Sequence, residues 1–151
     1  MLQPKRSKFK KNQKSRDKTE ILLTNQRLTR AVRLRRRIEN NQPIQSRGRY
    51  KIISLSIKRL RAATIEAVRR VITRKLKRTG RVFVCVHPSL SVTEKPLEVR
   101  MGKGKGAVSY WICRVKKGGV LYEIDGVDFS KAKSAWLLAN AKLPIKTKIC
   151  T

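Results

Sequence analysis

Residues 61–79 read "RAATIEAVRRVITRKLKRT" and give the clearest helix signal in the sequence. At 100° per residue, apolar side chains gather on one side of this predicted helix and cations on the other. The apolar side consists of Ile65, Val68, Val71, Ile72 and Leu76. The cationic side consists of Arg70, Arg74, Lys77 and Arg78. One side therefore predicts a core and the other a surface that meets anions, with a merely solvated face as the alternative.

The sequence marks the end of this helix more clearly than its start. Gly80 follows as a C′ residue that stops the helix. At the other end, Arg61 or Ala62 begins the helix, and neither is a good N-cap.

Short β-branched stretches surround the helix and predict strands. They are "YKIISLSI" at 50–57, "RVFVCVHP" at 81–88, "AVSYWICRV" at 107–115 and "VLYEID" at 120–125. Because the glycine-containing turn "KKGG" at 116–119 separates the last two, we expect them to pair as a hairpin.

A second helix is predicted after Ser130, whose hydroxyl can cap it. Pro144 ends this helix, and "IKTKI" at 145–149 adds a final strand. Its packing stripe consists of Ala132, Ala135, Trp136, Ala139 and Leu143. The expected fold is α+β over residues 48–151, with two helices packed on an antiparallel or mixed sheet.

The charge of the chain is extreme and uneven. The 151 residues hold 39 Lys and Arg against 9 Asp and Glu, for a formal net charge of +30. Residues 1–80 carry 26 of these cations and 4 of the acids. A charge of this size repels itself in a folded protein and needs a polyanion to neutralise it. Nucleic acid and an anionic membrane surface are the candidates, although no apolar run is long enough to span a membrane.

The N-terminal third has the composition of two basic segments. Residues 1–20 are too polar to fold alone and are expected to form an extended arm that penetrates RNA. Residues 21–47 form a basic insertion, in which "ILLTNQRLTRAVRLRRRIE" at 21–39 predicts an amphipathic helix, most firmly over 25–38. A helix that binds calmodulin or a membrane surface is the alternative to one that faces RNA.

The stretch "VRMGKGKGAVSYW" at 99–111 places three glycines and two lysines between strand-like residues. It matches neither the dinucleotide fingerprint G-x-G-x-x-G nor the P-loop pattern. Glycines at these positions permit positive φ and close backbone approach. Exposed N–H groups and two ammonium ions would suit phosphate oxygens, while a flexible soluble loop is the simpler alternative.

Nothing in the sequence predicts an enzyme, a metal site or a cofactor. Cys85, Cys113 and Cys150 are widely spaced and His87 is the one histidine, so a zinc site lacks paired ligands. Cys85 and Cys113 fall in strand-like runs, where we expect small buried hydrophobes. The few acids form no recognisable catalytic pattern with His87.

Several longer motifs resemble the L-sixteen family of large-subunit ribosomal proteins. They are "MLQPKRSKFKK" at 1–11, "TIEAVRRVITRKLKR" at 64–78, "TEKPLEVRMGKGKG" at 93–106, "VLYEIDGV" at 120–127 and "AKLPIKT" at 141–147. The resemblance implies a structural, non-enzymatic protein that binds large-subunit rRNA near the peptidyl-transferase centre. It also implies a role in forming the aminoacyl-tRNA (A-site) region. A free basic nucleic-acid-binding or membrane-surface protein outside the ribosome is the alternative.

Residues for this role follow from the cationic elements and the resemblance. Those expected to bind rRNA are Lys5, Arg6, Lys8, Lys10, Lys11, Arg16, Arg35, Arg36, Arg37, Arg70, Arg74, Lys77 and Arg78. The loop that the resemblance places near tRNA is Arg100, Met101, Gly102, Lys103, Gly104, Lys105 and Gly106. The expected partners are rRNA, the A-site and P-site tRNA region and neighbouring ribosomal proteins. No membrane, cofactor or homo-oligomer is expected.

Residues 17–47 are longer than the link at this place in family members. The resemblance therefore suggests no partner for this insertion. Its drift toward Lys, Arg and Ile is typical of an organellar form. A family-like start at Met1 argues against a long presequence. We therefore expect a protein encoded in a mitochondrion, with a bacterial or plastid origin as alternatives.

Overall fold

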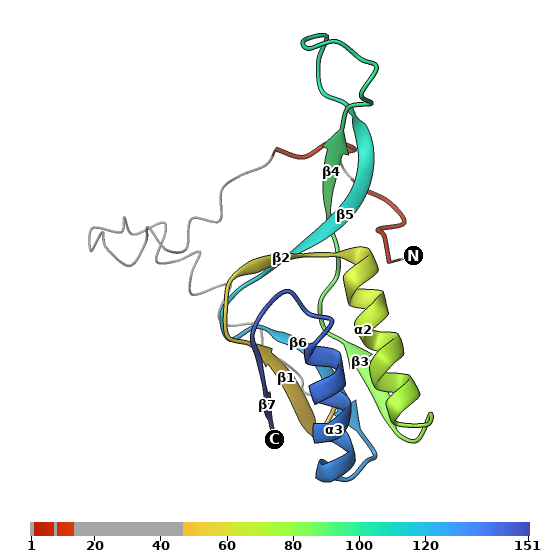
Figure 1. Ribbon diagram of the computed structural model, residues 1–151, viewed down its shortest axis with the longest axis vertical. Helices are drawn as coiled ribbons and strands as arrows, with labels where there is room; N and C mark the ends of the chain where they lie inside the picture. Colours follow the sequence, from red (N-terminus) through yellow and green to blue (C-terminus); the bar gives the residue numbers. More distant parts are fainter. Residues whose placement is uncertain (1, 8, 14–46) are drawn as a thin grey trace, which may run out of the picture. The chain divides into compact units, whose positions relative to one another are not determined.

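The computed structural model describes residues 2–7, 9–13 and 47–151. The helix predicted at 21–39 and most of the basic insertion lie outside these ranges. Residues 2–7 and 9–13 form neither helix nor strand. The elements are β1 (Tyr50–Ser54), β2 (Lys58–Arg61), α2 (Ala62–Lys75), β3 (Arg81–Val84), β4 (Leu90–Glu94), β5 (Ala107–Val115), β6 (Val120–Asp125), α3 (Phe129–Asn140) and β7 (Thr147–Cys150) (Figure 1).

The strands form two antiparallel sheets, which confirms the α+β class. One sheet has four strands in the order β3-β6-β1-β7, and the other has three in the order β2-β5-β4. β5 is the long central strand of the smaller sheet. It pairs with β4 over its first six residues and with β2 over its last four, so the two partners share Ile112.

The predicted hairpin between β5 and β6 is wrong, because these two strands belong to different sheets. The turn between them bonds to the end of β1 instead. Gly118 N–H donates to the Ser54 carbonyl at 2.7 Å, and Ser54 N–H donates to the Gly119 carbonyl at 3.0 Å. These bonds satisfy the backbone of the turn with a third strand, and the chain passes from one sheet to the other.

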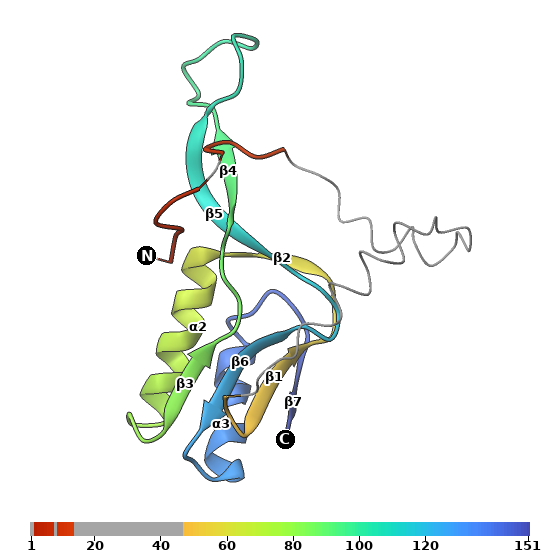
Figure 2. The same cartoon turned by 180° about the vertical axis from the view of Figure 1, so that it is seen from behind.

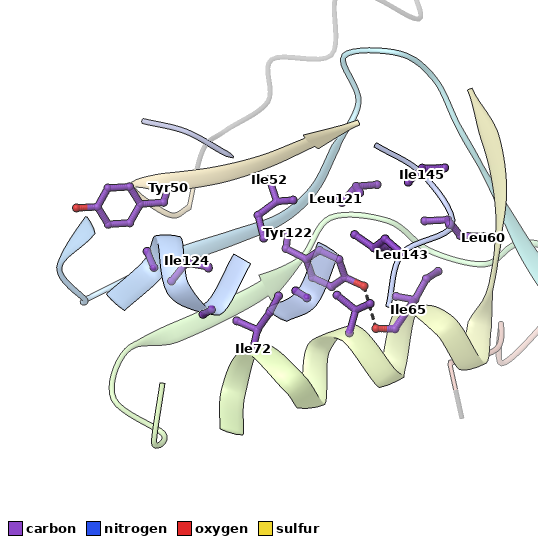
Figure 3. Packing of buried hydrophobic residues seen from close by; sticks show 14 of the residues in the cluster. Tyr50, Ile52, Leu60, Ile65, Ile72, Leu121, Tyr122, Ile124, Leu143 and Ile145 are labelled. Atoms are coloured by element: carbon purple, nitrogen blue, oxygen red, sulfur yellow. Dashed lines mark hydrogen bonds between the residues drawn. The ribbon is translucent and has the colours of Figure 1, made fainter. Parts of the chain in front are cut away.

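The core lies between the two helices and the four-stranded sheet (Figures 2 and 3). Ile65, Val68 and Ile72 on α2 are fully buried, as the periodicity predicts, while Val71 stays partly exposed. Tyr122 on β6 is also fully buried, and its hydroxyl donates to the Ile65 carbonyl at 2.8 Å. That bond gives the buried hydroxyl a partner, without which its burial would cost free energy. Burial also raises the pKa of Tyr122.

Alanines let α3 approach the rest of the core closely. Ala132, Ala135 and Ala139 are all fully buried, and Trp136 beside them is partly buried. The Trp136 indole N–H donates to the Thr147 hydroxyl at 2.9 Å, which ties α3 to β7. The predicted stripe is therefore confirmed, although Leu143 lies beyond the end of the helix.

The predicted end of α2 is wrong by four residues. The helix stops at Lys75, and the chain then takes positive φ at Lys77 (49°) and Arg78 (63°) before Gly80. Gly80 (φ 79°) therefore serves the turn into β3 and not the helix cap. A Cβ there would lie 2.4 Å from the Asp125 carbonyl oxygen, so the close approach itself requires glycine.

The helix starts differ in how well they are capped. Arg61 occupies the N-cap of α2 without a side-chain hydrogen bond, as expected. For α3 the prediction of Ser130 is wrong, because Asp128 is the cap and accepts a bond from the Ser130 N–H at 3.1 Å. A carboxylate at this place also interacts favourably with the helix dipole.

Several strand-level expectations need correction. The strand predicted at 50–57 ends at Ser54 as β1, and β2 at 58–61 is not predicted. β3 ends at Val84, so Cys85 lies just beyond the strand and is exposed instead of buried. Cys113 on β5 is half-buried, and burial raises the pKa of its thiol. β4 was not predicted, because its sequence "LSVTE" contains only two strong strand formers beside a leucine.

Candidate nucleic-acid interface

The outward face of α2 gathers arginines around an open hollow of about 260 Å³. The hollow is lined by Arg69, Arg70, Thr73, Arg74 and Arg78. Three of the four cations predicted on this face thus come together. Lys77 is exposed but does not line the hollow, whereas Arg78, also beyond the end of the helix, does. Helical periodicity does not predict Arg69 on this face, because Arg69 lies toward the apolar side of the helical wheel.

Glu66 holds two of these arginines in place. Arg69 Nε donates to Glu66 Oε2 at 2.9 Å and Arg69 Nη2 donates to Oε1 at 2.7 Å. Arg70 Nε donates to the same Oε1 at 3.0 Å. The Arg69 hydrogen bond in particular lowers the pKa of Glu66 to about 2, so the carboxylate stays charged at neutral pH. One acid thereby orients two guanidinium groups, and each keeps further N–H donors available.

The loop between β4 and β5 uses its glycines in two ways. Gly102 (φ 92°) and Gly104 (φ 82°) take left-handed conformations, and a Cβ at either would meet nothing within 4 Å. Gly106 has ordinary φ, but a Cβ there would lie 2.3 Å from the Glu94 carbonyl oxygen. Both predicted uses of glycine, positive φ and close backbone approach, are therefore present at different residues.

The N-terminal arm contacts the loop and β4 directly. Lys11 Nζ donates to the Lys105 carbonyl at 2.8 Å, and Lys105 Nζ donates to the Asn12 carbonyl. The Ser91 hydroxyl on β4 donates to the Lys10 carbonyl at 2.9 Å and accepts from Asn12 Nδ2 at 3.3 Å. In both views the red N-terminal segment lies beside β4 (Figures 1 and 2). Nothing in the sequence of either segment predicts this contact between the arm and the loop.

The structure describes some of the remaining predicted residues and not others. Lys5, Arg6, Lys10 and Lys11 of the arm and Arg100 to Lys105 of the loop are all exposed. Lys8, Arg16, Arg35, Arg36 and Arg37 lie outside the described ranges. The loop also exposes the apolar side chains of Leu97, Val99 and Met101, which composition alone did not single out.

Within the described ranges, no helix is long and apolar enough to cross a membrane. The same residues contain no group of three or more His, Cys, Asp or Glu side chains that could hold a metal ion.

Comparison with known proteins decides the family. The model of the family "Ribosomal protein L16p/L10e" matches residues 4–150. The chain belongs to this ribosomal protein family. It is 47% identical over 148 residues to the large ribosomal subunit protein uL16m of Prototheca wickerhamii, covering 98% of this chain and 96% of that protein. It is also 44% identical over 151 residues to the uL16 proteins of Acinetobacter baylyi and Acinetobacter baumannii, covering 100% of this chain and 97% of theirs.

Membership of this family makes the chain a structural constituent of the large ribosomal subunit and not an enzyme. The resemblance found in the sequence motifs is confirmed. The cationic surfaces described above are therefore those of a ribosomal protein, which accounts for the net charge of +30.

Proposed function

We propose that the chain binds large-subunit rRNA near the peptidyl-transferase centre and helps to form the A-site region that accepts aminoacyl-tRNA. Exposed cations on three separate elements support this proposal: the arm, the arginine face of α2 and the loop at 100–106. Cations spread in this way suit a protein surrounded by RNA strands better than one docked in a single groove.

Each element has its own place in the proposal. Residues 1–20 are the arm that penetrates rRNA, 21–47 are a basic insertion that lies on rRNA or a neighbouring protein, and 48–151 are the globular domain. The loop from Arg100 to Gly106 lies among rRNA strands on the side that faces tRNA, so its lysines meet rRNA phosphates beside the A site. All thirteen cations named in the sequence analysis are rRNA ligands in this proposal, including those in the arm and the insertion.

A pair of adjacent residues on α2 tests the rRNA part. Arg74 lines the hollow, whereas Lys75 is exposed and does not. For an rRNA fragment, the Arg74→Gln variant should lower the slope of log affinity against log salt by about one counterion. The matched Lys75→Gln variant should change it less. Binding by the unaltered chain that hardly varies with salt would overturn the proposal.

The A-site part needs an assembled particle. Subunits that contain the Lys103→Ala variant should bind aminoacyl-tRNA more weakly, while the melting temperature of the free variant stays unchanged. Equal losses of tRNA binding and of stability would instead assign the loop an architectural role.

We further propose that the protein works in a mitochondrial ribosome, with a bacterial or plastid ribosome as the alternative. The relative from Prototheca wickerhamii, whose name marks the mitochondrial form, supports this location, and the Acinetobacter relatives keep the bacterial alternative open. Fractionation of the source cells tests it, because the chain should sediment with large subunits from purified mitochondria after a moderate salt wash.

A further inference from the structure

We propose that the arm and the loop bind RNA as one unit, in which Lys11 and Lys105 are positioning residues and Lys103 is the lysine that meets phosphate. This inference rests on the proposed function, since it assumes that RNA is the ligand. It distinguishes three lysines that composition alone would treat as equivalent, and it changes the proposed role of Lys11 from a direct rRNA ligand to a positioning residue. The evidence is the set of hydrogen bonds joining residues 10–12 to Ser91 and Lys105, called here the arm–loop contact.

The arm–loop contact is reciprocal. Lys11 reaches from the arm to the carbonyl of Lys105, and Lys105 reaches from the loop to the carbonyl of Asn12. Hydrogen bonds with a charged donor are stronger than neutral ones. Each lysine therefore uses its ammonium group to hold the other segment, although the composition of both segments would suggest phosphate as the partner.

Ser91 fixes where along β4 the arm lies. Its side chain is only 5% exposed, and its hydroxyl both donates to the Lys10 carbonyl and accepts from the Asn12 amide. A buried hydroxyl with both functions satisfied selects one arrangement of its partners. The arm alone is too polar to fold. Leu2 packs against the core cluster, and the bonds to Ser91 and Lys105 hold residues 10–12 beside β4 and the loop.

Lys103 is placed differently from the other two lysines. All three are exposed, but the ammonium group of Lys103 has no partner among the described residues. Its backbone has φ 50° between Gly102 and Gly104, a conformation that costs an L-residue about 1 kcal/mol. Glycine would adopt this conformation with less strain. The lysine side chain is therefore what this position gains in return for the strain. Lys95 meanwhile donates to the Gly102 carbonyl and supports the same turn.

An ordered arm lowers the cost of binding. A polycation that is free in solution loses conformational entropy when RNA fixes it, and this loss weakens the observed affinity. The arm–loop contact orders residues 10–12 before RNA arrives, so less entropy remains to be lost. Removing the Lys105 ammonium group should therefore weaken RNA binding because the arm becomes less ordered. Removing the Lys103 ammonium group should weaken RNA binding because a phosphate contact is lost.

The first test needs no RNA. Lys→Met variants keep the length of the side chain and remove its ammonium group. We expect the ¹⁵N heteronuclear NOE of residues 10–13 in the full-length chain to fall in Lys105→Met and in Lys11→Met. In Lys103→Met it should match the unaltered protein. An unchanged NOE in Lys105→Met would overturn the arm–loop contact as an ordering device.

The second test separates positioning from phosphate binding. Lys103→Met should lower the salt slope of rRNA binding by about one counterion. Lys105→Met should weaken binding about fivefold with little change in slope, and Lys105→Arg should recover most of the affinity. A slope loss in Lys105→Met as large as in Lys103→Met would overturn the assignment. Salt-independent binding by the unaltered chain would instead overturn the proposed function, and the NOE comparison would still decide whether the arm–loop contact exists.

Discussion

The two sheets differ in their relation to the hydrophobic core. The four-stranded sheet packs with α2 and α3 around the main cluster of buried side chains, to which the three-stranded sheet contributes only Leu60 and Val115 as buried members. The far part of the smaller sheet buries Val92 and Ile112 outside that cluster and ends in the exposed loop. The difference indicates that stability is concentrated at one sheet and that the exposed side chains of the loop can change with little effect on it.

The largest expected effect is in the core. Ile65→Ala should lower the free energy of unfolding by about 2–5 kcal/mol, because Ile65 is fully buried between α2 and β6. Urea denaturation measures it. Leu97→Ala is the control in the exposed loop. Because Leu97 is fully exposed, this substitution should change the free energy of unfolding by less than about 0.5 kcal/mol. Similar losses in the two variants would break the comparison.

The next effect distinguishes two glycines of the same loop. Gly106→Ala should cost about 1–3 kcal/mol, because the added methyl meets the Glu94 carbonyl and displaces β4 from β5. Gly104→Ala has open space around it and should cost only about 1 kcal/mol for its positive φ. Thermal unfolding of both variants checks the order, and a larger loss in Gly104→Ala would contradict it.

A smaller effect tests the cap of α3. Asp128→Ala should cost about 1 kcal/mol, because the first turn loses the acceptor for the Ser130 N–H. Ser130→Ala leaves that N–H and its acceptor in place and should change stability by only a few tenths of a kcal/mol. Equal losses would restore Ser130 as the capping residue.

The smallest effect depends on pH. The pKa of Glu66 is about 2 in the folded protein, below its ordinary value of 4.5. Its contribution to stability is therefore complete above about pH 4.5 and is lost as pH falls toward 2. Because both arginines are partly exposed, we expect less than about 1 kcal/mol. Urea unfolding of Glu66→Gln should lack this part of the acid dependence, and an identical acid profile would contradict the role of Glu66.

Local patterns in the sequence predicted the elements better than their partners. The buried side of α2, the extent of β5 and β6 and the alanine stripe of α3 all follow from periodicity, because each depends on the residue's own segment. The β5–β6 hairpin was wrong because Ser54, more than sixty residues away, supplies the hydrogen bonds that hold the turn. No local rule contains that contact.

The candidate site divides in the same way. Arg70 and Arg74 share a face because of helical spacing, which the sequence shows. Glu66 orients Arg69 and Arg70 through side-chain bonds whose geometry the sequence does not show. The arm–loop contact joins residues that are about ninety positions apart, and both segments looked like simple phosphate-binding polycations. Only a structure could indicate that Lys105 and Lys11 hold backbone carbonyls.

The order of the strands also has a consequence for how the chain folds as it is synthesised. β4 and β5 are neighbours in sequence and in space, so their hairpin can form from local contacts at an early stage. β1 has to wait longer, because both of its partners, β6 (Val120–Asp125) and β7 (Thr147–Cys150), are synthesised only after β5. The hairpin that carries the loop can therefore exist on a nascent chain whose four-stranded sheet is still unfinished.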